Sequence, residues 1–129
     1  MKAYIAIPYQ SRNEIREVLD TITSILHQCE ISPFVFVDQY SFKAEEEKQM
    51  MQRAMEAINQ SHWLIALASE KAIGIGIEAG YAKGKGKPVI YIRHHKADHS
   101  TTLSGLSDYQ IIYIDLQDLA QKLQSIVEH

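Results

Sequence analysis

The chain of 129 residues has one cysteine, three prolines and one tryptophan, and none of its apolar runs is long enough to cross a membrane. Because Cys29 has no second cysteine to pair with, a disulfide within the chain and a zinc site built from several thiolates are both excluded. The first apolar run stops at Pro8, too early for a signal peptide. We therefore expect a cytoplasmic protein with no membrane partner.

An excess of positive charge is also lacking. The chain has 13 lysines and arginines against 16 aspartates and glutamates, which gives a formal net charge of −3 at pH 7. A surface that neutralises many phosphates is normally basic, so no nucleic-acid partner is expected, and a substrate should be a small molecule. With 46% hydrophobic and 22% charged residues, the chain should fold as a single domain spanning residues 1–129.

Short apolar runs alternate with helical periodicity along the whole chain. Strands are predicted at residues 3–7, 34–37, 63–68, 88–92 and 110–114, and helices at 15–26, 44–59, after the glycine-rich segment, and at 116–127. Ser11 and Asp115 are the predicted N-caps of the first and last helices. Residues 93–109 show no regular pattern. The rhythm predicts an α/β fold of the flavodoxin or Rossmann type, a doubly wound five-stranded parallel sheet in the order 2-1-3-4-5 with helices on both faces.

This strand order places a ligand site at the carboxyl ends of strands one and three, so residues 9–13 and 69–80 are the segments most expected to form it. The segment Gly74-Ile-Gly-Ile-Glu-Ala-Gly80 follows strand three, where glycines permit positive φ and a close approach of ligand to backbone N–H groups. Gly74 and Gly76 are therefore predicted to bind substrate. A dinucleotide-binding fingerprint follows the first strand of its fold, whereas these glycines follow the third. Asp98 has the spacing of the acid that binds the ribose in that motif, but it falls in the irregular stretch, so no cofactor is expected.

Glu78 is the one ionisable side chain in the glycine-rich segment. We expect it in the first turn of a helix, where the macrodipole favours the ionised carboxylate. An ionised carboxylate beside a ligand site can act as a nucleophile. The alternative is a glutamate that only stabilises its helix, and spacing leaves both interpretations open.

Residues 74–82, followed by Gly86-Lys-Pro-Val-Ile90, resemble the core motif of the nucleoside 2-deoxyribosyltransferase superfamily. The most similar branch is that of the 2′-deoxynucleoside 5′-phosphate N-hydrolases, and the similarity runs from Tyr4 to about Leu106. The resemblance implies that Glu78 attacks the anomeric carbon of a (deoxy)nucleoside or its 5′-monophosphate. Water or a second base would then resolve the glycosyl-enzyme, giving a hydrolase or a transferase.

The resemblance also assigns roles to two residues outside this segment. Tyr4 matches a tyrosine at the sugar site, and Ser104 resembles a serine that reaches the 5′-phosphate across a subunit interface. It therefore implies a homodimer or a higher homo-oligomer. The alternatives are a core aromatic for Tyr4 and an ordinary loop hydroxyl for Ser104.

The loop after strand one departs from the family pattern. Its Gly-Ser-Ile-Arg-like sequence is replaced by Ile7-Pro-Tyr-Gln10, and Pro8 removes one backbone N–H donor. Tyr9, Gln10 and Arg12 are the predicted substitutes that bind the sugar and the phosphate.

Two helper side chains of the family are also replaced. Ala54 stands where the resemblance implies an aspartate that orients the sugar or protonates the departing base, and Ala72 stands where it implies a phosphate-binding serine. Asp38, at the end of strand two, can replace the acid or simply form a turn. The second hypothesis is therefore a non-catalytic nucleotide-binding or regulatory domain. The histidines at 94, 95 and 99 lack helical ligand spacing and lie beside cations, so no metal site is predicted.

Overall fold

The computed structural model describes residues 1–8, 15–36, 43–67 and 73–128. Its centre is a sheet of five parallel strands in the order β2-β1-β3-β4-β5, as predicted. The strands are β1 (Lys2–Ala6), β2 (Ser32–Val35), β3 (Trp63–Leu67), β4 (Val89–His94) and β5 (Tyr109–Tyr113). The switch point of a doubly wound sheet thus falls between β1 and β3.

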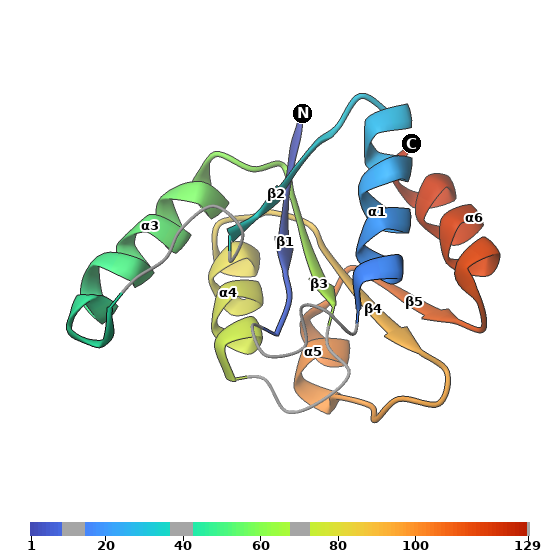
Figure 1. Cartoon of the computed structure of the whole chain (residues 1–129). Coiled ribbons are helices and arrows are strands. Elements are labelled where there is room, and N and C mark those ends of the chain that lie inside the picture. Colours follow the sequence, from blue (N-terminus) through green and yellow to red (C-terminus); the bar gives the residue numbers. More distant parts are fainter. Residues whose placement is uncertain (9–14, 37–42, 68–72, 129) are drawn as a thin grey trace.

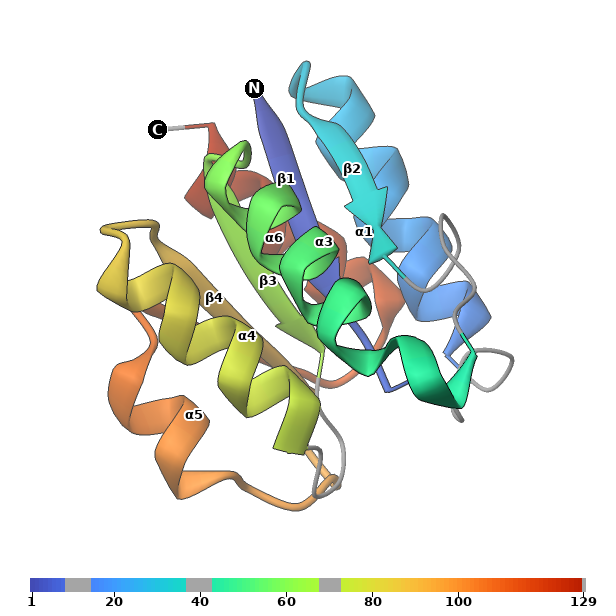
Figure 2. The ribbon, with the colours of Figure 1, turned by 90° about the vertical axis from the view of Figure 1, so that its left-hand side faces the viewer.

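Helices cover both faces of this sheet, which confirms the predicted fold class (Figure 1). One face carries α1 (Arg16–Gln28) and α6 (Leu116–Val127). The other carries α3 (Glu47–Asn59), α4 (Ile73–Gly84) and α5 (Thr101–Leu106), which lie in front of the strands in Figure 2, and the 3-10 turn η2 (Ala44–Glu46) leads into α3. None of the described helices is long and apolar enough to span a membrane.

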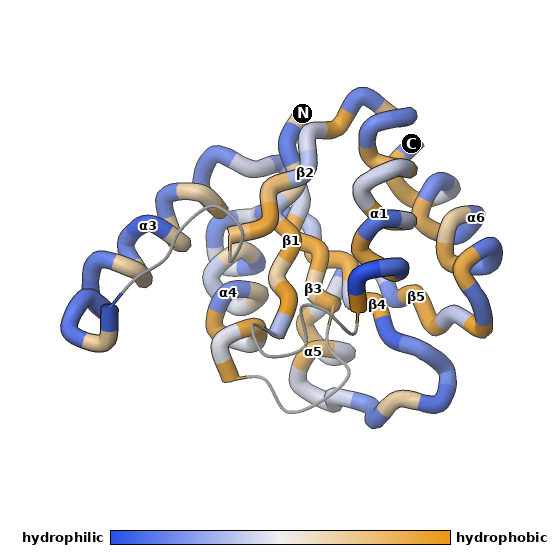
Figure 3. The backbone as a smooth tube through the Cα atoms, viewed as in Figure 1, coloured by the Kyte–Doolittle hydropathy of each residue, from blue (hydrophilic) through white to orange (hydrophobic). Residues whose placement is uncertain are grey.

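The two faces differ in the side chains that fill them. Alternation along β1 sends Ala3 and Ile5 toward α1 and α6, and sends Tyr4 and Ala6 toward α4. The side of α1 and α6 is packed mainly with isoleucine and leucine. In Figure 3 the strands of the sheet are largely hydrophobic, and the helices that cover them have hydrophilic outer turns. The side of α4 combines buried alanines and two buried tyrosines with larger aliphatic residues: Ala6, Ala66, Ala79, Ala82, Tyr4, Tyr91, Ile58, Leu64, Ile75, Val89 and Leu103.

The start of α4 differs from the prediction. The glycine-rich segment is not a turn before a helix but lies inside α4, which begins at Ile73. Glu78 is therefore in the second turn, beyond the reach of a first-turn dipole effect. In the described part of the chain, Gly86 is the glycine with positive φ, at 77°. A Cβ added at Gly74 or Gly76 would meet nothing within 4 Å, so packing within the chain does not require either glycine.

Two further local predictions have different outcomes. Asp115 is the N-cap of α6, and its side chain accepts a hydrogen bond from Asp118 N, as expected. Ser11, the predicted cap of the first helix, lies outside the described residues, and α1 begins at Arg16 with Ile15 as its N-cap. Ile15 is partly buried and packs against the core.

The stretch predicted to be irregular contains the short helix α5. Ser100 caps it by accepting a hydrogen bond from Leu103 N, and the Ser100 N–H donates to the Tyr91 hydroxyl. Six residues are too few to show helical periodicity in the sequence, which explains why the helix was missed.

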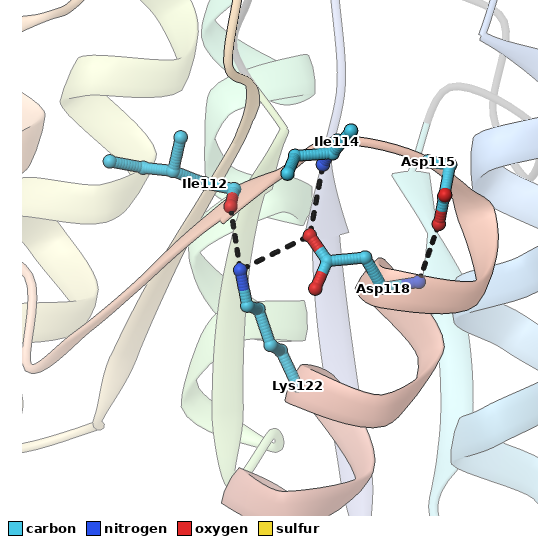
Figure 4. A network of polar contacts seen from close by, with 5 residues as sticks. All are labelled: Ile112, Ile114, Asp115, Asp118 and Lys122. Atoms are coloured by element: carbon cyan, nitrogen blue, oxygen red, sulfur yellow. Dashed lines mark hydrogen bonds and ion pairs between the residues drawn. The ribbon is translucent and has the colours of Figure 1, made fainter.

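The outer edge of β5 is closed by polar contacts with α6, drawn in Figure 4. Lys122 Nζ donates to the Ile112 carbonyl at 3.0 Å and to Asp118 at 3.1 Å, and Asp118 also accepts from Ile114 N at 2.9 Å. The Tyr113 carbonyl, by contrast, accepts from His95 N. Because consecutive carbonyls of a strand point in opposite directions, Lys122 occupies an acceptor on the free edge of the sheet, where another strand could otherwise pair.

Candidate active site

The structure joins the two residues predicted to be catalytic. Tyr4 lies in the middle of β1 and is fully buried, and its hydroxyl donates a hydrogen bond to Glu78 Oε2 on α4. The residues are 74 positions apart in the sequence, and it is the packing of α4 on the sheet that brings them together. In the described part of the chain, the other carboxylate oxygen, Oε1, accepts no hydrogen bond.

Burial sets the protonation of both groups. Loss of hydration raises the pKa of Glu78 to about 6, although the hydrogen bond from Tyr4 opposes this rise. Burial, together with the charge of Glu78 and the hydrogen bond to it, raises the pKa of Tyr4 well above the ordinary phenol value. At neutral pH, Tyr4 is thus a neutral donor and Glu78 is mostly an ionised carboxylate that remains easy to protonate.

Two phenylalanines that the sequence analysis did not single out lie beside Tyr4. The ring of Phe34 on β2 is 5.8 Å from the Tyr4 ring between centroids, and that of Phe36, just beyond the strand, is 6.3 Å away and stacked. Phe34 is the register partner of Tyr4, and Phe36 follows two positions later on the same face. The predicted strand order already placed β2 beside β1, but the register that sets Phe34 opposite Tyr4 was not predicted, so these aromatic neighbours were missed.

Ala54 was predicted to replace an acid on the second helix. It lies on α3 with 3% of its surface exposed, and its match to an aspartate of the family remains a prediction of the resemblance. A methyl group neither donates a proton nor binds a hydroxyl. Asp38, the proposed replacement, lies outside the described residues, as do Tyr9, Gln10, Arg12 and Ala72.

Ser104 is not joined to the Tyr4–Glu78 pair within the chain. It lies on α5, and its hydroxyl accepts a hydrogen bond of 2.6 Å from Gln110, at the start of β5. Its role across a subunit interface remains a prediction. Gly74 and Gly76 lie in α4 ahead of Glu78, with backbone in helical rather than loop conformation.

The loop histidines pack against aromatic rings. His94 lies edge-on to Tyr113 at 5.3 Å between centroids, and its ring is 4.5 Å from that of His95, whereas His99 approaches Tyr91. Residues 1–8, 15–36, 43–67 and 73–128 hold no group of three or more His, Cys, Asp or Glu side chains that could bind a metal.

Comparison with known proteins gives the family. The model of the nucleoside 2-deoxyribosyltransferase family matches residues 3–122. The chain belongs to this family. A Thermofilum pendens protein described as a 2′-deoxynucleoside 5′-phosphate N-hydrolase is 23% identical over 139 residues, which cover 98% of this chain and 95% of the relative.

Solved structures share the fold of this family member. A CMP N-glycosidase from Clostridium botulinum superposes with a TM-score of 0.71 at 18% identity, covering 97% of this chain and 99% of the other. A 2-deoxyribosyltransferase from Bacillus psychrosaccharolyticus gives a TM-score of 0.73 at 16% identity, covering 95% and 96% of the two chains. The parallel sheet in the order 2-1-3-4-5 is therefore the family fold.

Proposed function

We propose that this protein is an enzyme that cleaves the N-glycosidic bond of a (deoxy)nucleoside or its 5′-monophosphate, with Glu78 as the nucleophile. The observation that carries the proposal is the hydrogen bond from buried Tyr4 to Glu78 in a chain of the nucleoside 2-deoxyribosyltransferase family. Tyr4 orients this carboxylate through Oε2, and because no described residue donates to Oε1, we assign the attack to Oε1.

The reaction follows from the chemistry of the pair. Oε1 of Glu78 forms a bond to the anomeric carbon while the bond from that carbon to the base nitrogen breaks, and the electron pair of that bond leaves with the base. Tyr4 keeps its proton throughout and fixes Oε2. Water then attacks the anomeric carbon and loses a proton to the solvent, the ester bond to Glu78 breaks, and its electron pair restores the carboxylate. A second base in place of water would complete a transfer.

The departing base needs a proton, and the side chain at position 54 cannot supply one. General acid catalysis typically contributes a factor of about 10²–10⁴. We propose that Asp38 or solvent protonates the base, so bases that leave easily should be the better substrates. The buried methyl group of Ala54 also favours a second candidate, a nucleotide-binding domain with little or no turnover.

Base release measured by chromatography tests the proposal, with a panel of nucleosides and nucleoside 5′-monophosphates. Release by the wild-type chain should be lost in Glu78→Gln and retained in Glu17→Gln, a matched change at an exposed glutamate on the opposite face of the sheet. Binding of nucleotide without release of any base would support the second candidate instead. The resemblance also predicts a homodimer, which light scattering would detect as a particle of twice the 14.7 kDa chain mass.

A further inference from the structure

Arg93 lies at the carboxyl end of β4, on the face of the sheet that carries Tyr4 and Glu78. Tyr91, two residues earlier, is part of the buried cluster that contains Tyr4. Since alternate residues of a strand point to the same face, the Arg93 side chain also belongs to this side. Parallel strands place their carboxyl ends at the edge of the sheet where ligands bind.

One nitrogen of the Arg93 guanidinium is held by backbone carbonyls. Nη1 donates to the His94 carbonyl at 3.3 Å and to the Ala97 carbonyl at 3.1 Å, both in the connection between β4 and α5. Nε, on the other side of the guanidinium, is buried and has no hydrogen-bond partner. Among the described residues, the ion pairs of Lys83 with Asp108 and of Lys122 with Asp118 do not include Arg93.

A buried N–H group with no acceptor is unfavourable, and native proteins keep few of them. The edge formed by Nε and Nη2 of an arginine matches two oxygens of a phosphate or carboxylate at once. In Arg93 the carbonyl contacts occupy Nη1 and orient the plane of the guanidinium. They leave the edge that is best suited to bind an anion.

We propose that Arg93 binds the phosphate of a nucleoside 5′-monophosphate and thereby makes the site prefer phosphorylated over unphosphorylated nucleosides. Two strand spacings, about 10 Å, separate β4 from β1, and an extended nucleoside monophosphate has a comparable length. This inference rests on the proposed function, because it gives that site its substrate class. The competing role for Arg93 is to close the loop between β4 and α5 through Nη1 alone.

Steady-state kinetics on one nucleoside and its own 5′-monophosphate separate the two roles. Arg93→Gln should raise KM for the monophosphate about 10- to 100-fold, the loss expected for hydrogen bonds to a charged group, with kcat little changed. For the unphosphorylated nucleoside, kcat/KM should stay as in the wild type. Lys96→Gln removes an equal charge from an exposed position in the same loop and should leave both substrates unaffected. An equal loss on both substrates, or no loss on the monophosphate, would overturn the proposal.

A binding measurement keeps this test independent of turnover. Calorimetry with Glu78→Gln and with the double variant Glu78→Gln/Arg93→Gln should show about 10- to 100-fold weaker binding of the monophosphate when Arg93 is lost, and unchanged binding of the nucleoside. That result would support phosphate binding by Arg93 even if the wild-type chain released no base. Absence of base release would contradict the proposed function alone. If Arg93→Gln does not fold, Arg93→Lys keeps the charge but loses the two-pronged edge, and monophosphate binding should still weaken while nucleoside binding does not.

Discussion

The two faces of the sheet have different compositions and different tasks. The face under α1 and α6 is filled with aliphatic side chains, with Ile22, Leu26 and Leu123 fully buried there. The face under α4 and α5 contains four buried alanines among its aliphatic residues and carries Tyr4, Glu78 and Arg93. The packing of α4 on the sheet places a carboxylate against a phenol. We infer that the first face supplies stability and that the second accepts a stability cost for chemistry.

The largest expected effect separates function from stability at one residue. Glu78→Gln should lower base release by about 10³-fold or more, because the amide is a poor nucleophile. It should also raise the free energy of unfolding at neutral pH by about 1–2 kcal/mol, since it removes a carboxylate whose pKa is raised to about 6. Base-release assays and urea denaturation measure the two quantities.

The pH dependence gives the sign of this stability effect. The folded chain holds the Glu78 proton up to about pH 6, above the ordinary value of 4.5, so it binds more protons than the unfolded chain between these values. The contribution of Glu78 to stability is therefore lost as pH rises through that window. The difference in unfolding free energy between Glu78→Gln and wild type should be small near pH 4 and largest above pH 7. If the difference in unfolding free energy stays constant from pH 4 to above pH 7, burial of the ionised Glu78 carboxylate does not destabilise the fold, and the assignment is contradicted.

On the aliphatic face, a substitution should lower stability and leave activity unchanged. Leu26→Ala leaves a cavity in a fully buried part of the core and should lower the free energy of unfolding by about 2–5 kcal/mol. Because Leu26 lies on the opposite side of the sheet from Glu78, kcat per folded molecule should be unchanged. Urea denaturation combined with active-fraction kinetics checks both statements, and a large fall in kcat would show that the faces are coupled.

A smaller effect should follow from removing the Tyr4 hydroxyl. Tyr4→Phe deletes the hydrogen bond that opposes the rise in the Glu78 pKa, so that pKa should move above about 6. Base release should then fall about 10-fold near neutral pH, as expected for the loss of one hydrogen bond to a charged group. The acidic limb of kcat/KM against pH should shift to higher pH. An unshifted limb would mean that Tyr4 does not control Glu78.

The smallest effect is expected at the outer edge of β5. Lys122→Met removes the donor to the Ile112 carbonyl and to Asp118, both in exposed surroundings (Figure 4). It should lower Tm slightly, and the difference should shrink with added salt because exposed ion pairs are screened. Base release should not change. Thermal denaturation at low and high ionic strength measures this effect.

The fold was more predictable than the site, for physical reasons. Strand order followed from apolar runs alternating with helical periods, because parallel strands buried on both faces have a strong sequence pattern. Glu78 stood out as a lone carboxylate among glycines, but its place in the second turn depended on the start of α4 at Ile73, which the sequence did not indicate. The contacts of Tyr4 with Glu78 and Phe34 join distant segments, so spacing could not supply them. The state of Arg93 appears only when its hydrogen bonds are known.

The anomeric configuration of the product tests the role of Glu78 most directly. When methanol competes with water, the methyl glycoside formed by the wild-type chain can be assigned by its proton NMR spectrum. Attack by Glu78 followed by attack of methanol is a double displacement, so a β-nucleoside or its 5′-monophosphate should give the β-methyl glycoside, with retained configuration. The α-methyl glycoside would indicate a single displacement and would contradict a glycosyl-enzyme on Glu78.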